Sequence, residues 1–320
     1  MNDKTKQVQD KARELLASGE VEQVIGFRRG TEPYRSTPVF VTSAEDAEKL
    51  IADCTCTQNL ANYVRKLPAK AAVVAKGCDA RALAVLISEN QIKRDDLVII
   101  GVPCEGLVDI EKLRAAEGVR MADVTELELD GEILVVRMGE EELRLPAGEM
   151  LRDECLGCQC PTPVLCDVLV GEEIEPRDEA KFNELMNRIE AMSEEERAKY
   201  FEENFSKCLR CFACVRGCPM CYCTTCFAIQ DKPQYLPRIT GLDENRMFHL
   251  GRAMHLAGRC VGCGACDRAC PVNIPLRALN TKLAHETKEL FSVVAGLDMD
   301  KQPPLTEFLP GDTEEALDTH

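Results

Sequence analysis

The sequence predicts an N-terminal α/β domain, a helical linker and a small cysteine-rich domain, and three observations predict this division. Short apolar segments alternate with segments of helical periodicity over the first 120 residues. A strongly acidic stretch, also of helical periodicity, follows after about residue 170. Eleven of the 19 cysteines lie beyond residue 205. We therefore expect domains at residues 1–170, 171–205 and 206–295, followed by an acidic tail at residues 296–320.

The N-terminal domain is expected to be built around a parallel sheet. Val8, Ala12 and Leu15 recur at helical spacing and predict the first helix. Further along, short and almost wholly apolar strands are each followed by a helical pattern, which is typical of parallel strands covered on both faces. The expected strands are residues 22–27, 37–43, 70–77 and 96–103, and the expected helices between and after them are residues 44–53, 79–92 and 109–118.

Residues 121–150 change to the alternating pattern of antiparallel strands. Asp130-Gly131, in the middle of residues 124–138, is a strong signal of a hairpin turn. Residues 141–145 add another strand. The parallel sheet is therefore expected to carry an antiparallel annex.

The linker is expected to contain two helices. Ser193 and Glu196 fit a capping box at the start of the second helix. The first helix carries an apolar stripe that is typical of core packing, made of Phe182, Leu185, Met186, Ile189 and Met192.

The composition excludes several classes of protein. The chain has 55 acidic and 39 basic residues and a net charge of −16. Such a surface repels phosphate backbones, so nucleic acid is not expected as a partner. The apolar runs are far shorter than the ~20 residues of a membrane span, and the charged N-terminus lacks the apolar core of a signal peptide. We therefore expect a cytoplasmic protein whose cysteines bind metal rather than form disulfides.

Two runs of cysteines share the spacing C-x2-C-x2-C-x3-C-P, which is typical of a bacterial ferredoxin-like module with two 4Fe-4S clusters. Zinc sites usually have separated C-x2-C pairs instead. The fourth cysteine of each run serves the other cluster in such modules. Gly262 and Gly264 in the second run let backbone amides approach the sulfurs. The expected ligands are Cys208, Cys211, Cys214 and Cys270 for the first cluster, and Cys260, Cys263, Cys266 and Cys218 for the second.

Four further cysteines stand where a third cluster is expected. Cys78 and Cys104 each follow an expected parallel strand, so both should lie at the same carboxyl edge of the sheet, where α/β sheets bind ligands. Cys155 and Cys158 supply a C-x2-C on the returning loop. Four thiolates that converge there would hold another 4Fe-4S cluster.

The segments "AKGCDARAL", "GVPCEG" and "CLGC…CDVLVG" around these cysteines resemble the beta subunits of coenzyme F420-reducing, that is deazaflavin-reducing, hydrogenases and formate dehydrogenases. The resemblance covers about residues 20–170 and rests on three separated elements in the same order. It implies an iron–sulfur flavoprotein that passes electrons between a flavin and a chain of clusters. It also fits the second part of the chain, since a ferredoxin module often accompanies this domain in the family.

One departure from the family concerns the flavin. Members that bind FAD carry a Ser-Gly-Gly-type loop before the first of these strands, whereas residues 53–67 read "DCTCTQNLANYVRKL" and contain no glycine that would let a pyrophosphate approach the backbone. The presence of FAD is therefore left open. Lys76 and Arg81 are the candidates to contact a cofactor phosphate.

Seven cysteines remain, and three of them lie directly after the first run. Cys221, Cys223 and Cys226 form a C-x-C-x2-C pattern that we expect to hold a fourth cluster, completed by Cys56 from the N-terminal domain. Cys54, Cys160 and Cys166 are alternatives for that fourth ligand, and buried, redox-idle thiols are the alternative to a fourth cluster.

Two functional classes agree with these observations. The first is an electron-transfer subunit of an anaerobic oxidoreductase complex, which connects a catalytic formate dehydrogenase or hydrogenase to a heterodisulfide-reductase-like or other flavin-bearing acceptor. The second is a flavoenzyme subunit, in which FAD on this chain exchanges a hydride with a deazaflavin or nicotinamide carrier. A zinc scaffold is a third class, and no catalytic triad, phosphate loop or pair of acids indicates other chemistry.

Overall fold

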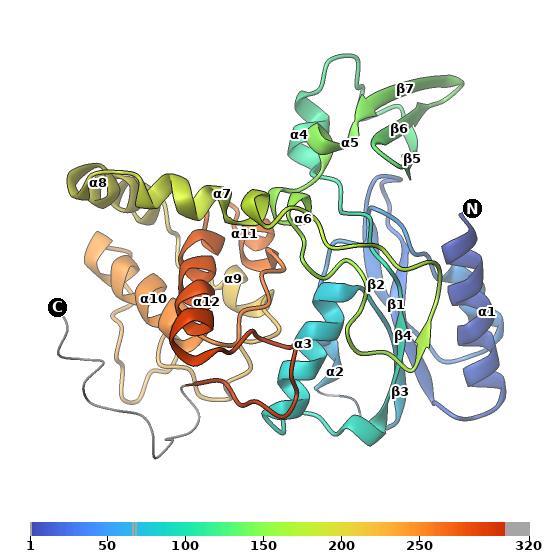
Figure 1. Ribbon diagram of the computed structural model, residues 1–320, viewed down its shortest axis with the longest axis horizontal. Helices are drawn as coiled ribbons and strands as arrows, with labels where there is room; N and C mark the ends of the chain where they lie inside the picture. Colours follow the sequence, from blue (N-terminus) through green and yellow to red (C-terminus); the bar gives the residue numbers. More distant parts are fainter. Residues whose placement is uncertain (1, 66, 68, 305–320) are drawn as a thin grey trace.

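The computed structural model describes residues 2–65, 67 and 69–304. An α/β half contains the N-terminal residues, and a helical half contains the two cysteine runs (Figure 1). No helix in the described ranges is both long enough and apolar enough to span a bilayer.

The main sheet consists of β1 (Gln23–Arg29), β2 (Ser36–Val41), β3 (Ala71–Ala75), β4 (Leu97–Gly101) and β8 (Val168–Leu169). Its strand order is β2-β1-β3-β4-β8. β1, β3, β4 and β8 run parallel, and β2 is an antiparallel edge strand. β3 and β4 are buried along their whole length, as expected for parallel strands covered on both faces. β8 has only two residues and has no counterpart among the strands expected from the sequence.

Helices cover both faces of this sheet (Figure 1). α1 (Asp3–Ala17) buries Val8, Ala12 and Leu15 in one apolar cluster, which confirms the first expected helix. α3 (Gly77–Ser88) packs its apolar residues into a second cluster on the opposite face. The fold class expected from periodicity, a parallel sheet between helices, is therefore present.

The segment expected as a helix at residues 44–53 is shorter than predicted. It forms only the 3-10 turn η1 (Glu45–Lys49), although the amide of Asp46 donates to Ser43 Oγ as a helix cap would. Directly afterwards, the amide of Ile51 donates to the carbonyl of Phe27 at 2.8 Å. This bond to β1 pulls the chain into an extended conformation and ends the helical turn. The short helix α2 (Ala61–Val64) follows.

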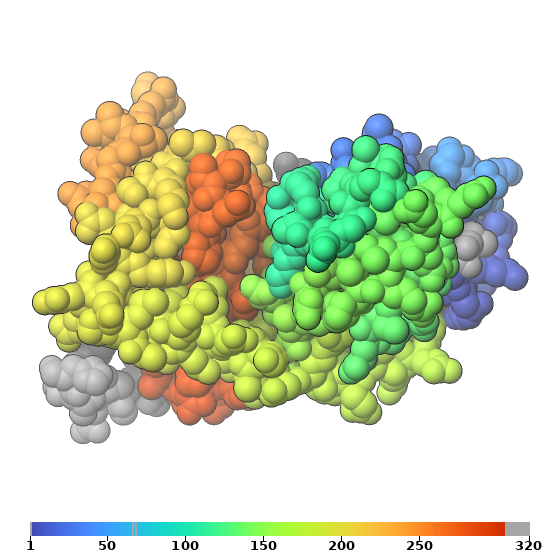
Figure 2. All heavy atoms as spheres, turned by 90° about the horizontal axis from the view of Figure 1, so that it is seen from above, coloured from blue at the N-terminus to red at the C-terminus, as the bar shows by residue number. Residues whose placement is uncertain are grey.

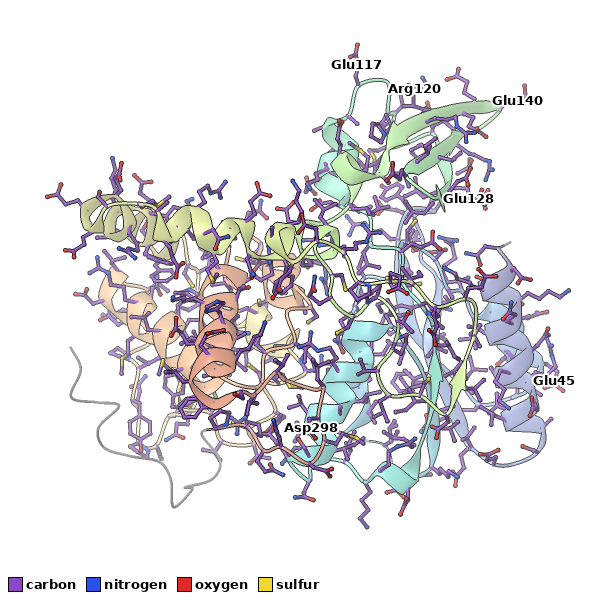
Figure 3. All side chains as sticks on the ribbon, in the orientation of Figure 1. Glu45, Glu117, Arg120, Glu128, Glu140 and Asp298 are labelled. Atoms are coloured by element: carbon purple, nitrogen blue, oxygen red, sulfur yellow. The ribbon has the colours of Figure 1, made fainter. Side chains whose placement is uncertain are left out.

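The antiparallel annex forms a sheet of its own. It contains β5 (Val124–Asp130), β6 (Ile133–Met138) and β7 (Glu141–Pro146) in that order. Its apolar face packs on α4 (Ile110–Ala115), α5 (Ala147–Met150) and the loop before α4, and not on the main sheet. Glu140 points outward from it, as does Glu117 in the loop between α4 and β5 (Figure 3).

The helical half begins with the linker. α6 (Asp153–Leu156) leads through a loop to α7 (Glu179–Glu190) and α8 (Glu194–Phe205), and the expected capping box of Ser193 and Glu196 is present. α9 (Ala213–Arg216), α10 (Leu242–His255), α11 (Ala265–Ala269) and α12 (Arg277–Phe291) follow. α12 packs against α7, and both are visible at the surface when the molecule is seen from above (Figure 2).

Candidate iron–sulfur sites

The two cysteine runs share one backbone conformation. In the first run Arg210 and Phe212 adopt left-handed φ angles of 47° and 59°, and in the second run Gly262 and Gly264 do so at 70° and 65°. These residues flank the second cysteine of each run, and a short helix, α9 or α11, begins directly afterwards. Non-glycine residues adopt this conformation only at an energetic cost. Arg210 and Phe212 therefore adopt this loop conformation at an energetic cost, whereas Gly262 and Gly264 adopt the same conformation without it.

Backbone amides point toward cysteine sulfurs in both runs. The amide of Arg210 lies 3.4 Å from Cys208 Sγ, and the amide of Gly262 donates to Cys260. After the second run, the amide of Ile274 lies 3.3 Å from Cys270 Sγ. Successive amides that surround an anion form a concave binding site of the type found around iron–sulfur clusters. Both loops thus present the donors that a sulfur-ligated cluster requires.

The structure brings together the four cysteines expected for the first cluster. One small cavity is lined by all of them, together with Phe248 and His249. Burial raises the pKa of the Cys214 thiol to about 11. A thiol of that kind stays protonated at neutral pH unless a metal stabilises its thiolate. Cys208, Cys211, Cys214 and Cys270 therefore fit a cluster site better than they fit free thiolates.

The second expected set also comes together. Cys218 from the first run lies close enough to Cys260, Cys263 and Cys266 to raise the pKa of each thiol, after the larger effect of burial. The last cysteine of each run is thus placed beside the other run. Among the described residues no three His, Cys, Asp or Glu side chains converge as ligands of a single metal ion, whereas a 4Fe-4S cluster takes its thiolates on separate irons.

The third expected set lines a cavity of about 420 Å³ at the carboxyl edge of the sheet. β3 and β4 end beside each other because Ala75 pairs with Gly101, and Cys78 and Cys104 follow these ends. Cys155 and Cys158 enter the same cavity from the loop after the annex. The strand register therefore explains why residues so far apart in sequence meet here.

The returning loop lies directly on the first turn of α3. A Cβ atom on Gly77 would lie 1.7 Å from the carbonyl oxygen of Cys160. The amide of Cys104 also donates to the carbonyl of Pro161 at 2.9 Å. Glycine at position 77 is thus required for the close approach that brings the C-x2-C loop to the strand ends.

Cysteines that the sequence did not assign to this site also line the third cavity. Cys160 and two ligand candidates of the second set, Cys260 and Cys263, belong to its wall. Cys263 is close enough to Cys78 to raise the pKa of its thiol, after burial and Asp79. The second and third sets are therefore direct neighbours, which sequence spacing alone gives no means to predict.

Lys76 and Arg81, the candidates for a cofactor phosphate, are both engaged within the protein. Lys76 is buried, pairs with Asp79 at 2.7 Å and lies over the ring of Phe27. Arg81 donates to the carbonyl of Ala295 at 2.7 Å and 2.9 Å. Arg81 therefore fastens the α/β half to the end of the helical half, and Lys76 stabilises the loop around Cys78.

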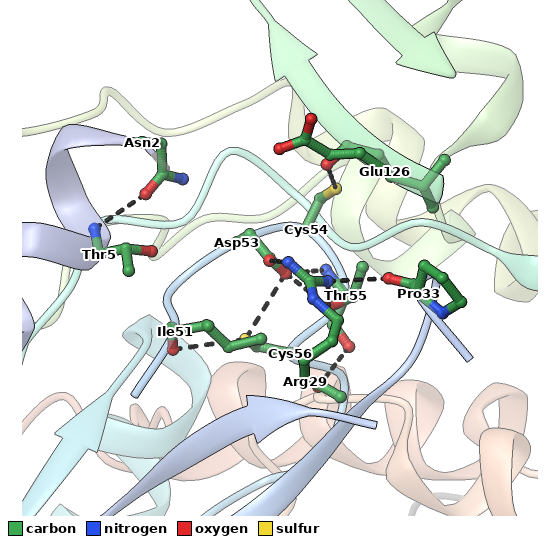
Figure 4. A network of polar contacts seen from close by, with 12 residues as sticks. Asn2, Thr5, Arg29, Pro33, Ile51, Asp53, Cys54, Thr55, Cys56 and Glu126 are labelled. Atoms are coloured by element: carbon green, nitrogen blue, oxygen red, sulfur yellow. Dashed lines mark hydrogen bonds and ion pairs between the residues drawn. The ribbon is translucent and has the colours of Figure 1, made fainter. Parts of the chain in front are cut away.

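The four cysteines expected for a fourth cluster are placed in different surroundings. Cys56 is buried beside Asp53, and its thiol faces the carbonyl of Ile51 (Figure 4). Cys221 lies against Cys218, whereas Cys223 is exposed. Cys226 packs on the apolar cluster around Phe205 and Phe248. The thiol of Cys56 is thus directed toward its own loop, which turns toward β1 and the annex.

That loop borders a second cavity, of about 650 Å³, which shares Lys76 and Cys104 with the third cluster site. Its wall carries six acidic and four basic side chains. All four bases are ion-paired within the protein: Lys4 with Glu105, Arg29 with Asp53, Lys76 with Asp79 and Arg137 with Glu126. An anionic pyrophosphate prefers unpaired cations or exposed amides. These residues therefore fit an anionic dinucleotide poorly.

Two side chains of α10 lie beside the cysteine runs. His249 is buried, and its ring stacks on Phe205 at 4.8 Å. Arg252, one helical turn later, is buried too and lies among the cysteines of both runs. A pair of polar residues at i and i+3 within an apolar pattern is the weak signal that could have pointed to this face of the helix.

Two family models match adjacent parts of the chain. Residues 69–202 match the family model that describes the C terminus of the coenzyme F420 hydrogenase/dehydrogenase beta subunit. Residues 204–274 match the model described as a 4Fe-4S dicluster domain.

Two curated relatives span nearly the whole chain. The F420-dependent formate dehydrogenase subunit beta of Methanocaldococcus jannaschii is 24% identical over 91% of this chain and 91% of its own length. The corresponding subunit of formate dehydrogenase 1 of Methanococcus maripaludis is 26% identical over 91% of this chain and 90% of its own.

Among solved structures, a chain of the F420-reducing [NiFe] hydrogenase complex from Methanosarcina barkeri has a TM-score of 0.40 and 16% identity, over 49% of this chain and 62% of that one. This chain is thus similar, over 91% of its length, to F420-dependent formate dehydrogenase beta subunits. Its residues 69–202 match the C-terminal family model of the coenzyme F420 hydrogenase/dehydrogenase beta subunit, and its residues 204–274 match a 4Fe-4S dicluster domain.

Proposed function

We propose that this chain is an electron-transfer subunit of an oxidoreductase complex and that it holds three 4Fe-4S clusters. The first is held by Cys208, Cys211, Cys214 and Cys270, the second by Cys260, Cys263, Cys266 and Cys218, and the third by Cys78, Cys104, Cys155 and Cys158. Such clusters take up and release single electrons. The cysteines of this chain hold and space them, and its backbone amides donate to their sulfurs.

One observation carries this proposal. The cavity of the third set is also lined by Cys260 and Cys263 of the second set, and the second set borrows Cys218 from the run that supplies the first. The three sets therefore adjoin one another from the sheet edge into the helical half. A fourth cluster is not required to connect the two halves, which leaves Cys221, Cys223 and Cys226 as thiols without a cluster.

The partners follow from the family. The curated relatives are beta subunits of F420-dependent formate dehydrogenases. We infer that this chain connects a formate dehydrogenase-like or hydrogenase-like catalytic subunit with a flavin-bearing acceptor subunit, such as a heterodisulfide-reductase-like protein. The bond-breaking chemistry then takes place on the partner, and this chain contributes no catalytic residue.

A flavoenzyme remains the second candidate because one observation favours it. The cavity of about 650 Å³ lies beside Cys104 at the carboxyl edge of the sheet, where α/β proteins bind ligands. Its basic side chains are all ion-paired and its acidic side chains are in excess, so the cavity disfavours FAD, whose pyrophosphate is anionic. The electron-transfer function without flavin is therefore our proposal.

The two candidates are distinguished on the anaerobically purified chain. We expect acid extraction to release iron but no FAD, and reduced coenzyme F420 alone to leave the visible absorption of the clusters unchanged, since a hydride donor needs a flavin to deliver single electrons. Dithionite, a one-electron reductant, should bleach the same absorption. FAD in the extract, together with bleaching by reduced coenzyme F420, would establish the flavoenzyme instead.

A further inference from the structure

The helix α10 comes from the long insertion between the two cysteine runs and turns one face toward both cluster sites. Phe248, His249 and Arg252 are buried on this face. Arg246, on the same helix, is exposed and pairs with Asp243 at 3.1 Å. The helix thus carries one arginine in solvent and one in the interior.

Arg252 lies between the first and the second set of cysteines. Its Nη2 donates to the carbonyl oxygen of Cys214 at 3.2 Å. The side chains of Cys214, Cys218, Cys221 and Cys266 are near neighbours of its guanidinium. Because a guanidinium is not deprotonated in proteins, Arg252 is positively charged beside ligands of both clusters.

Within the described ranges of the chain, this charge has no carboxylate partner, whereas the mostly buried Arg268 pairs with Glu154 at 2.9 Å. Arg252 is only 5% exposed, and no described residue accepts a hydrogen bond from its Nε. An isolated buried charge is costly unless an opposite charge compensates it. Apart from the thiol of Cys221, which also contacts Arg252, the negative charge available to it is that of the thiolate-ligated clusters.

We propose that Arg252 compensates the charge of the two ferredoxin-type clusters and thereby raises their reduction potentials. The inference rests on the proposed function and deepens it. Reduction of a cluster adds one electron and no proton, so the site gains one negative charge. A fixed guanidinium in a buried, low-dielectric position stabilises that charge more than it stabilises the oxidised form. Arg252 is a positioning residue in this account and not a ligand.

A purely structural role would rest on the hydrogen bond to Cys214, and two variants separate the two roles. Arg252→Lys keeps the positive charge but loses the planar guanidinium and its donor geometry. Arg252→Gln keeps an amide donor but removes the charge. If charge is what matters, the lysine variant keeps the wild-type potentials and the glutamine variant does not.

The test is a redox titration of the anaerobically purified protein, followed by electron paramagnetic resonance, for wild type, both Arg252 variants and the matched control Arg246→Gln. We expect Arg252→Gln to lower the equilibrium constant for reduction of the two ferredoxin-type clusters at least tenfold, which corresponds to about 59 mV for one electron. Arg252→Lys should lie within threefold of wild type, and Arg246→Gln should not differ from it.

The remaining outcomes decide either the inference about Arg252 or the proposed function. Cluster signals with wild-type potentials in Arg252→Gln overturn the inference, and so do equal downward shifts in the glutamine and lysine variants, because those would indicate hydrogen bonding. If Arg252→Gln does not retain iron, the lysine variant decides: a tenfold shift in it rejects compensation by charge, and unchanged potentials support it. Wild-type protein without cluster signals would instead reject the proposed function itself.

Discussion

Glu154 and Arg268 form a buried ion pair of 2.9 Å across the boundary between the two halves of the molecule. Glu154 directly precedes Cys155 of the third set, and Arg268 lies between the second set's Cys266 and the first set's Cys270. Arg268 also donates to the carbonyl of Cys263 at 2.6 Å. The pair therefore fixes the loops of neighbouring cysteine sets relative to each other.

Replacing this carboxylate should destabilise the protein. Glu154→Gln leaves the guanidinium of Arg268 buried without its counter-charge, and breaking a buried pair in this way costs about 3 kcal/mol. Denaturant unfolding of the anaerobic protein measures the free energy of unfolding. Glu111→Gln is the control, because Glu111 forms an exposed pair with Arg114 and should cost less than about 0.5 kcal/mol. Equal effects of the two substitutions would contradict a structural role for the buried pair.

The close approach at Gly77 predicts a selective loss of the third cluster. In Gly77→Ala the new Cβ would clash with the Cys160 carbonyl, which is 1.7 Å away, so the C-x2-C loop must move away from the strand ends. We expect the variant to lose about four irons, one cubane, and to keep the two ferredoxin-type signals. Gly148→Ala, where no atom lies within 4 Å of the new Cβ, should keep its full iron content. Full iron content in Gly77→Ala would show that the third cluster does not require this close approach.

Exchange of the last cysteine between the runs predicts crossed effects. Cys270→Ser should perturb the cluster of the first run, because Cys270 shares a cavity with Cys208, Cys211 and Cys214. Cys218→Ser should perturb the cluster of the second run, because Cys218 lies close to Cys260, Cys263 and Cys266. Electron paramagnetic resonance of each variant identifies which signal changes. If each substitution changed only the signal of its own run, the crossed ligation would be wrong.

The surplus thiols are expected to differ in reactivity. Cys223 is exposed and Cys56 is buried, so an alkylating reagent should label Cys223 in the native protein and leave Cys56 unlabelled until the chain unfolds. Labelling of Cys223 should not release iron, which is measured in the same sample. Release of about four irons upon this labelling would instead indicate the fourth cluster that the sequence pattern predicted.

Periodicity predicted most of the scaffold of the third site. Because β3 and β4 are recognisable as apolar parallel strands with a cysteine after each, the sequence predicted that Cys78 and Cys104 lie at the same edge of the sheet. It did not predict that the annex forms a separate sheet or that β8 exists, since neither a strand's pairing partner nor a two-residue strand leaves a local sequence pattern. The surroundings of Cys56 did not follow from the sequence either, because the direction of its loop depends on packing against β1, which is distant in sequence.

The left-handed loop conformation of the first run could have been predicted from the sequence. Arg210 and Phe212 occupy the positions that Gly262 and Gly264 hold in the second run, so superposing the two runs indicates left-handed backbone at both. The burial of Arg252 was much harder to predict, because the sequence of a helix does not show which of its arginines is buried unless the surface it packs against is known.

Iron and acid-labile sulfide counts on the anaerobically purified wild-type chain test the central claim, a line of three clusters, most directly. The account predicts about twelve irons and twelve sulfides per chain, four for each cubane, and about eight of each in Cys78→Ser. About eight in the wild type would remove the third cluster and with it the connection between the two halves, and about sixteen would contradict the conclusion that Cys221, Cys223 and Cys226 hold no cluster.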